Sequence, residues 1–165
     1  MKNLIIGILL LIFSHGCINP FAPKLDTELG DQSSIISPQK SIEGLFQNFK
    51  QSYTFKDTTI YGGLLTSKYS FIYRDYDLSV DVSWGRDEDM KVTYGLFQNS
   101  QRLDLIWNNI ISMSQDSTNI IRSFNLTITF NPTDIIYIDG RVNLDIEKNN
   151  KGVWKIVNWV DESNF

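Results

Sequence analysis

Apolar and polar residues alternate through the last third of the chain, and this pattern restricts the possible folds most. Four segments follow it or carry strand-forming residues: residues 101–115, 124–130, 136–147 and 153–160. Short polar sequences, residues 131–134 and 149–152, separate the last three segments and have the composition of turns. The pattern predicts an antiparallel meander of four long strands, whose single apolar face other elements must cover.

Three amphipathic helices are predicted to cover that face. The first spans residues 41–53, with apolar side chains at helical spacing: Ile42, Leu45, Phe46, Phe49 and Tyr53. A shorter second helix follows Asp57, which can cap it, and a third begins at the acids 87–89 and ends near residue 98. One side of the third helix is expected to carry Met90, Thr93, Tyr94 and Phe97. Two strands, residues 68–74 and 78–82, are predicted between these helices, which makes the domain α+β.

The amino terminus has the composition of a secretory signal. Lys2 precedes an apolar run at residues 4–13, and this run ends shortly before Cys17, the only cysteine in the chain. A helix of that length spans about 15 Å, half the thickness that a transmembrane helix must cross. We therefore predict a signal peptide over residues 1–16, and a single cysteine cannot form an internal disulfide.

Gly16 and Cys17 resemble the last two positions of the lipobox of bacterial lipoproteins, although Ser14 departs from the aliphatic residue usual in that motif. In that family the cysteine thiol carries a diacylglycerol, the signal is removed just before it, and the new amino terminus is acylated. The resemblance implies lipid attachment, including palmitate, at Cys17. It also implies anchoring in a bacterial cell envelope, at the outer membrane and facing the periplasm or the surface. The alternative is an ordinary signal peptide that ends near an incidental cysteine.

The segment that follows has the composition of a tether. Residues 17–40 contain Pro20, Pro23 and Pro38, are rich in Ser, Asp and Gln, and show no sustained period. We predict a flexible linker there, followed by a single α+β domain over residues 41–165. The alternative is that Phe21 and Leu25 dock on the domain as an ordered arm.

The predicted order of elements resembles the cystatin-like, nuclear transport factor 2-like superfamily. Residues 57–71 are similar to its second helix and first strand, and Gly152 followed by Trp154-Lys155-Ile156 is similar to its closing strand. The resemblance implies three N-terminal helices packed on a curved, mostly antiparallel sheet, as a cone with a cavity at one end. The competing folds are another α+β domain with helices packed on a sheet and a lipocalin-like barrel, and the three helices argue against the barrel. Members include isomerases, dehydratases and cyclases, as well as binding and dimerisation modules, so the fold leaves function open.

Composition and charge argue against several functions. The formal charge is −4, and loss of Lys2 with the signal leaves 14 basic against 19 acidic residues, which disfavours nucleic-acid binding. His15, the only histidine, lies in the predicted signal, and acylation would occupy the Cys17 thiol, so neither supplies a catalytic base or nucleophile. The sequence has no phosphate-loop, zinc or serine-hydrolase motif, and we predict no cofactor and no metal. The acids 87–89 are interpreted as a helix start rather than a cation site.

Two groups of residues are candidates for a pocket or a binding surface. Asp75 with a neighbouring tyrosine could act as base and oxyanion donor in a dry cavity, or it could fix a solvated turn. The aromatic candidates, which could equally pack as ordinary core, are Tyr73, Trp84, Tyr94, Trp107, Trp154 and Trp159. Trp154 and Trp159 are an odd number of positions apart, so we expect them on opposite faces of the last strand, one of them open to a partner.

Three functions are consistent with these features. The first is a membrane-anchored, non-catalytic lipoprotein whose domain binds a small apolar ligand or a protein partner. The second is a small isomerase- or dehydratase-like enzyme that uses an Asp/Tyr pair. The third is a homodimeric structural module. A carboxyl group with a raised pKa inside the cavity would favour the second function.

Overall fold

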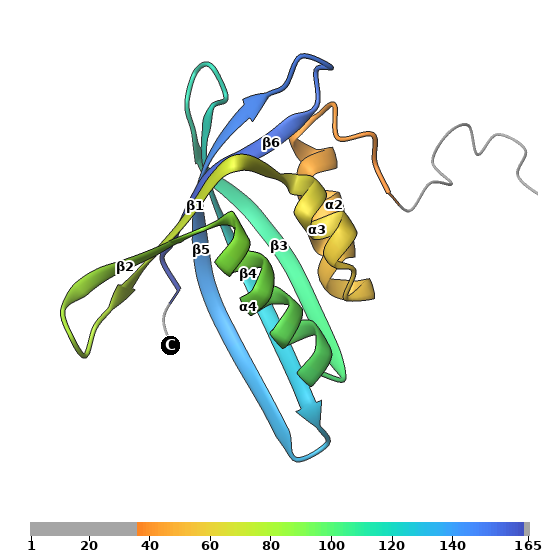
Figure 1. Ribbon diagram of the computed structural model, residues 1–165, viewed down its shortest axis with the longest axis vertical. Helices are drawn as coiled ribbons and strands as arrows, with labels where there is room; N and C mark the ends of the chain where they lie inside the picture. Colours follow the sequence, from red (N-terminus) through yellow and green to blue (C-terminus); the bar gives the residue numbers. More distant parts are fainter. Residues whose placement is uncertain (1–35, 164–165) are drawn as a thin grey trace, which may run out of the picture. The chain divides into compact units, whose positions relative to one another are not determined.

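Three helices and six strands make up the part of the chain that the computed structural model describes, residues 36–163 (Figure 1). The first four elements are α2 (Ile42–Phe55), α3 (Thr58–Leu64), β1 (Leu65–Asp75) and β2 (Val80–Gly85). They are followed by α4 (Arg86–Asn99), β3 (Arg102–Met113), β4 (Asn119–Asn131), β5 (Asp134–Lys148) and β6 (Trp154–Asp161). The predicted order of elements and the α+β fold class are confirmed.

The first two helices begin at the residues whose side chains can cap them. Ser41 Oγ accepts a 3.1 Å hydrogen bond from Gly44 N at the start of α2. Asp57 Oδ1 accepts from Thr59 N and Ile60 N at 2.7 and 3.0 Å at the start of α3. Such caps satisfy amide groups that have no partner within the helix, and so they fix where each helix begins.

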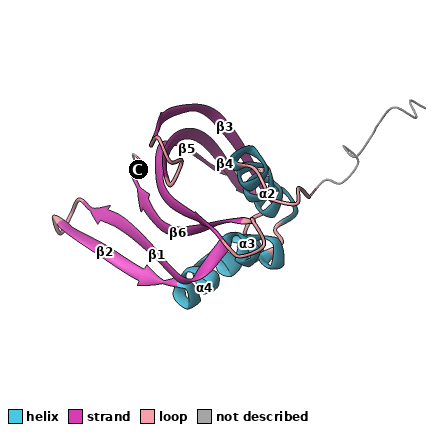
Figure 2. Cartoon of the chain, turned by 90° about the horizontal axis from the view of Figure 1, so that it is seen from above, coloured by secondary structure: helices cyan, strands magenta, loops and turns pink. Residues whose placement is uncertain are grey.

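The sheet has the strand order β2-β1-β6-β5-β4-β3. β3, β4, β5 and β6 form the predicted antiparallel meander, whereas β1 pairs with β6 in parallel and with β2 as a hairpin. Seen from above, the sheet is strongly curved and the three helices lie at its open side (Figure 2). α2 contacts β3, and α4 contacts β1 and β2, so helices border both ends of the curved surface.

The period-two pattern decides which side chains face the helices. In β4 the inward positions are Ile120, Arg122, Phe124, Leu126 and Ile128, each at most 9% exposed. In β5 the buried positions follow the same alternation at Val142, Leu144 and Ile146. The apolar residues among these eight positions belong to one hydrophobic core, which also contains the apolar face of α2.

β6 corrects the expectation for its two tryptophans. Trp154 and Trp159 are both buried, at 8% and 9% exposure, although an odd number of positions separates them. Ile146 pairs with Ile156 but Asp145 pairs with Asn158, so the strand accommodates one extra residue, Val157. A bulge of this kind reverses the alternation of side chains, and it turns both rings inward.

α4 corrects a second expectation. Tyr94 is 55% exposed, whereas the buried residues of this helix are Asp89, Thr93 and Phe97. These three recur every fourth residue and so define one face of the helix, and Tyr94 lies one position, about 100°, away from that face.

Residues 37–39, just before α2, are hydrogen-bonded to α2 and β6. Ser37 N donates to Asn48 Oδ1 at 2.7 Å, and Asn48 Nδ2 donates to Ser37 O at 2.9 Å. Gln39 is 6% exposed; its Nε2 donates to Trp154 O at 2.6 Å, and Trp154 N donates back to Gln39 O at 3.0 Å. A Cβ on Gly44 would lie 2.3 Å from Ser37 Oγ, so a larger residue there would displace the Ser37 side chain.

The predicted signal peptide, Cys17, Phe21 and Leu25 lie outside the described residues. Within residues 36–163, no helix is long and apolar enough to cross a membrane.

Candidate functional site

A cavity of about 330 Å³ lies between the helices and the inner face of the sheet. The helices contribute the aromatic side chains of Phe49, Tyr53 and Tyr61. The strands contribute six further rings: Phe71, Tyr73, Trp84, Trp107, Phe124 and Trp159. Aliphatic residues of α4, β3, β4 and β5 complete the wall. A concave, largely apolar space with a few polar groups is the usual form of a small-molecule site.

The rings are held in place by contacts with one another. Phe49 lies 5.3 Å from the ring centroids of Tyr53 and Trp107 and 5.4 Å from that of Trp159. Phe71 stacks on Trp84 at 4.7 Å with an interplanar angle of 19°. Each of the nine rings contacts at least one other, so the rings of the wall support one another by packing.

Asp89 is the more deeply buried of two carboxyl groups in the wall. Its Oδ2 accepts from the hydroxyl of Tyr61 at 2.7 Å, and its Oδ1 accepts from Trp84 Nε1 at 3.0 Å and from the hydroxyl of Tyr69 at 3.5 Å. Burial raises the pKa of Asp89, and the three donors oppose that shift because they stabilise the carboxylate. The residue is 4% exposed, so its charge state matters for both stability and binding.

Asp161, at the end of β6, is the second carboxyl group. It accepts hydrogen bonds from the hydroxyl of Ser163 and, at 3.2 Å, from Ser163 N. Burial also raises the pKa of Asp161, against the effect of these two donors. Ser163 packs on Gly140 of β5, where a Cβ would lie 2.6 Å from the Ser163 hydroxyl. Gly140 therefore allows the carboxyl-terminal segment to lie on the inner face of the sheet.

Three tyrosines surround Asp89. Burial raises the pKa of Tyr53, Tyr61 and Tyr69, and the negative charge of Asp89 raises each further, so all three phenols stay neutral. Tyr61 and Tyr69 donate to Asp89, whereas the Tyr53 hydroxyl donates to no described residue. Tyr53 lines the cavity, and its hydroxyl can bond to a ligand there.

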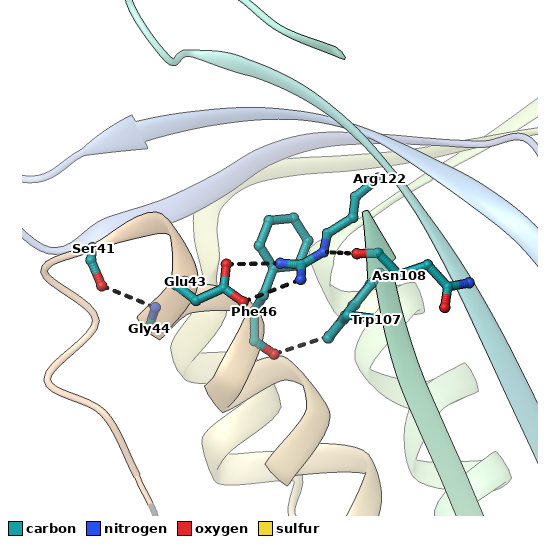
Figure 3. A network of polar contacts seen from close by, with 7 residues as sticks. All are labelled: Ser41, Glu43, Gly44, Phe46, Trp107, Asn108 and Arg122. Carbon is teal, nitrogen blue, oxygen red and sulfur yellow. Dashed lines mark hydrogen bonds and ion pairs between the residues drawn. The ribbon is translucent and has the colours of Figure 1, made fainter. Parts of the chain in front are cut away.

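A polar network holds α2 against the sheet next to the cavity (Figure 3). Arg122 donates to both carboxylate oxygens of Glu43, at 3.0 and 3.1 Å, and its Nε donates to Asn108 O at 2.8 Å. Its guanidinium carbon lies 4.6 Å from the ring centroid of Phe46. Trp107 Nε1 donates to Phe46 O at 3.0 Å. This network fixes the position of α2, and thereby of Phe49 and Tyr53.

The structure brings together four of the seven candidates for a pocket. Tyr73, Trp84, Trp107 and Trp159 line the cavity. Asp75 is the last residue of β1, where it accepts from Leu78 N of the hairpin turn at 2.9 Å, and it is not part of the cavity wall. Tyr94 is exposed on α4, and the ring of Trp154 lies under Lys148 Nζ at 4.8 Å, outside the cavity.

The two carboxyl groups of the wall were not among the candidates. Asp89 stands in a run of acids at a helix start, which is normally exposed, but it lies four positions before Thr93 and eight before Phe97, and this spacing is a signal of the buried face. Asp161 is the last residue of a strand whose alternation is reversed at Val157, so its inward direction has no sequence signal. Among residues 36–163, no group of three or more acids, histidines or cysteines is placed to hold a metal ion.

Solved structures share the fold of this domain at low sequence identity. A scytalone dehydratase-like protein from Novosphingobium aromaticivorans matches with a TM-score of 0.65 and 14% identity, over 76% of this chain and 83% of that protein. A protein of unknown function from Exiguobacterium, described as nuclear transport factor 2-like, matches with a TM-score of 0.54 and 12% identity, over 73% of this chain and 98% of that one. The domain has the nuclear transport factor 2-like fold.

Other neighbours of this fold differ in description. An aromatic ring hydroxylase-like protein, also from Novosphingobium aromaticivorans, matches with a TM-score of 0.62 and 11% identity, over 77% of this chain and 90% of that protein. No protein-family model matches the sequence, and no curated protein matches it significantly. The nuclear transport factor 2-like fold is therefore established by structure, while function must be argued from the cavity.

Proposed function

We propose that the domain binds a small, largely apolar molecule in its aromatic cavity, and that it does so at a bacterial membrane to which Cys17 is attached by lipid. The observation that carries the binding proposal is the cavity itself: about 330 Å³, walled by nine aromatic rings that pack on one another. The membrane proposal rests on the apolar run at residues 4–13 followed by Gly16 and Cys17.

Titration calorimetry of the full-length chain in a nonionic detergent tests the binding proposal. The probe is 2-tetralone, a bicyclic aromatic ketone, with empty micelles as the blank. We expect saturable binding. Leu96→Trp should abolish this binding, because Leu96 of α4 lines the cavity and the larger indole side chain would occupy space that the probe needs. Leu78→Trp is the matched control, since Leu78 is 70% exposed on the β1–β2 hairpin. Equal binding by both variants would place the probe outside the cavity.

A second function, proton transfer on the bound molecule, is favoured by one observation. Asp89 and Asp161 are carboxyl groups whose pKa values burial raises, and they stand in the cavity wall beside phenolic hydroxyls. Both oxygens of Asp89 already accept hydrogen bonds, so Asp161 is the better placed to accept a proton from a ligand.

Deuterium exchange into 2-tetralone separates this function from binding alone. A carboxylate base in the cavity should accelerate the exchange of the protons next to the carbonyl for deuterium in heavy water. Nuclear magnetic resonance measures this exchange rate. Asp161→Asn should remove the acceleration while 2-tetralone still binds. If 2-tetralone exchanges no faster with the wild-type protein than in buffer alone, binding remains the proposed function.

A further inference from the structure

Part of the aromatic wall lies next to Asp161. Tyr73 is in register with Asp161 on the neighbouring strand β1, and Phe71 is in register with Trp159. The centroid of Phe71 lies 5.2 Å from that of Trp159, and Tyr73 lies 5.4 Å from Trp84. We name these four rings, Phe71, Tyr73, Trp84 and Trp159, the mouth cluster. They place several π faces around a space that a carboxyl group borders.

The two carboxyl groups of the wall have no positive partner. The five ion pairs seen among the described residues involve neither Asp89 nor Asp161. Arg74 and Arg141 line a second, neighbouring pocket with Asp161, and both are paired with other acids: Arg74 with Asp81 at 2.9 Å, and Arg141 with Glu162 at 3.3 Å. The hydrogen bonds that Asp161 accepts come from Ser163, a neutral residue.

The aromatic rings, together with carboxyl groups that have no positive partner, make the cavity selective for the charge of its ligand. An anion in the cavity would be repelled by the carboxylates, and a neutral molecule would gain only from burial of its apolar surface. A cation would gain from the carboxylate and also from the ring faces, because the quadrupole of an aromatic ring attracts positive charge. An alkylated ammonium group suits such a site, since it carries its charge with little hydration and an apolar surface.

We propose that the cavity binds a lipophilic organic cation, with the positive nitrogen between Asp161 and the mouth cluster. This inference rests on the proposed binding function and adds the chemical class of the ligand. The raised pKa of Asp161 agrees with it, because a bound cation supplies the counter-charge that the folded chain lacks at this position.

Calorimetry with three benzyl or phenyl probes of different charge tests the class of ligand on the wild-type chain. They are benzyltrimethylammonium, benzyl alcohol and benzenesulfonate, each titrated into the full-length chain in nonionic detergent. We expect the cation to bind at least about tenfold more tightly than the alcohol, and the sulfonate not to bind. Equal affinity of the cation and the alcohol overturns the inference and leaves the binding function standing. Failure of all three probes to bind counts against both.

Variants then locate the charge. Asp161→Asn should lower the affinity for the cation at least about tenfold and leave the affinity for benzyl alcohol nearly unchanged. Asp75→Asn on the hairpin should change neither affinity. Tyr73→Leu should lower the affinity for the cation, whereas Tyr73→Phe, which keeps the ring, should not. An undiminished affinity for the cation in Asp161→Asn, with the thermal midpoint of the wild type, would overturn the placement at Asp161.

Discussion

The hydroxyl of Tyr61 donates a 2.7 Å hydrogen bond to Oδ2 of Asp89, and this bond joins α3 to the first turn of α4 inside the cavity wall. Both residues are buried, at 1% and 4% exposure. Tyr61→Phe keeps the ring and removes one of three donors to the carboxylate. At neutral pH the substitution should lower the free energy of unfolding by about 1–3 kcal/mol, the usual cost of a lost hydrogen bond to a charged group.

The cost of Tyr61→Phe should depend on pH. Burial raises the pKa of Asp89, so the folded state becomes less stable as pH rises from the ordinary aspartate range toward the raised value. Loss of the Tyr61 donor raises that pKa further, which adds to the penalty at neutral pH and not below the ordinary pKa, where Asp89 is protonated in both states. Urea unfolding at neutral pH and at about pH 3 measures the difference. Tyr76→Phe, 72% exposed, is the control. An equal cost at both pH values would show that Asp89 is uncharged throughout.

The sequence predicted the order of elements well because patterns of burial are local. Period two in β4 and helical spacing in α2 each follow from one face meeting the core, and both were recognised from the residues alone. The inward direction of the two carboxyl groups in the cavity wall depends on how their helix or strand packs as a whole. Asp89 is inward because α4 turns its 89–93–97 face to β1, and Asp161 is inward because a bulge at Val157 reverses the alternation of β6. The helical spacing of Asp89 from Thr93 and Phe97 is a sequence signal of the first cause, whereas the bulge at Val157 has no signal in the residues around it.

Gly140 should be intolerant of a side chain. A Cβ there would lie 2.8 Å from Ser163 Cα and 2.6 Å from its hydroxyl, so Gly140→Ala must displace the segment that holds Asp161. We expect a loss of about 1–3 kcal/mol in the free energy of unfolding, as for other overpacked sites. Gly95→Ala is the matched control, because nothing lies within 4 Å of a Cβ at that position of α4. That change should stabilise the helix by about 0.5–1 kcal/mol. Urea unfolding of the two variants should therefore shift in opposite directions.

The ion pair between Arg122 and Glu43 should respond unequally to loss of its two partners. The Arg122 side chain is 10% exposed, stacks on Phe46 and binds Asn108 O, whereas the Glu43 side chain is 72% exposed. Arg122→Ala removes the packing on Phe46 and the hydrogen bond to Asn108 O as well as the charge, and should cost about 2–5 kcal/mol, as for other truncations of buried side chains. Glu43→Gln leaves the stacking intact and should cost about 1 kcal/mol or less. Denaturant unfolding measures both, and similar costs would mean that the charge pair, and not the packing of Arg122, holds α2 in place.

Lipid attachment at Cys17 can be tested without the domain's ligand. Expression in a bacterial host with an alkyne-labelled palmitate should label the wild-type chain, because Gly16 and Cys17 resemble the end of a lipobox, whose cysteine is acylated. Cys17→Ala removes the acceptor thiol and should abolish labelling. Ser14→Leu, which supplies the aliphatic residue usual at that lipobox position, should preserve or increase it. Mass spectrometry of the labelled protein should find the lipid on a peptide that begins at Cys17. Labelling that persists in Cys17→Ala, or a wild-type chain that begins elsewhere and carries no lipid, would leave the ordinary signal peptide as the correct interpretation.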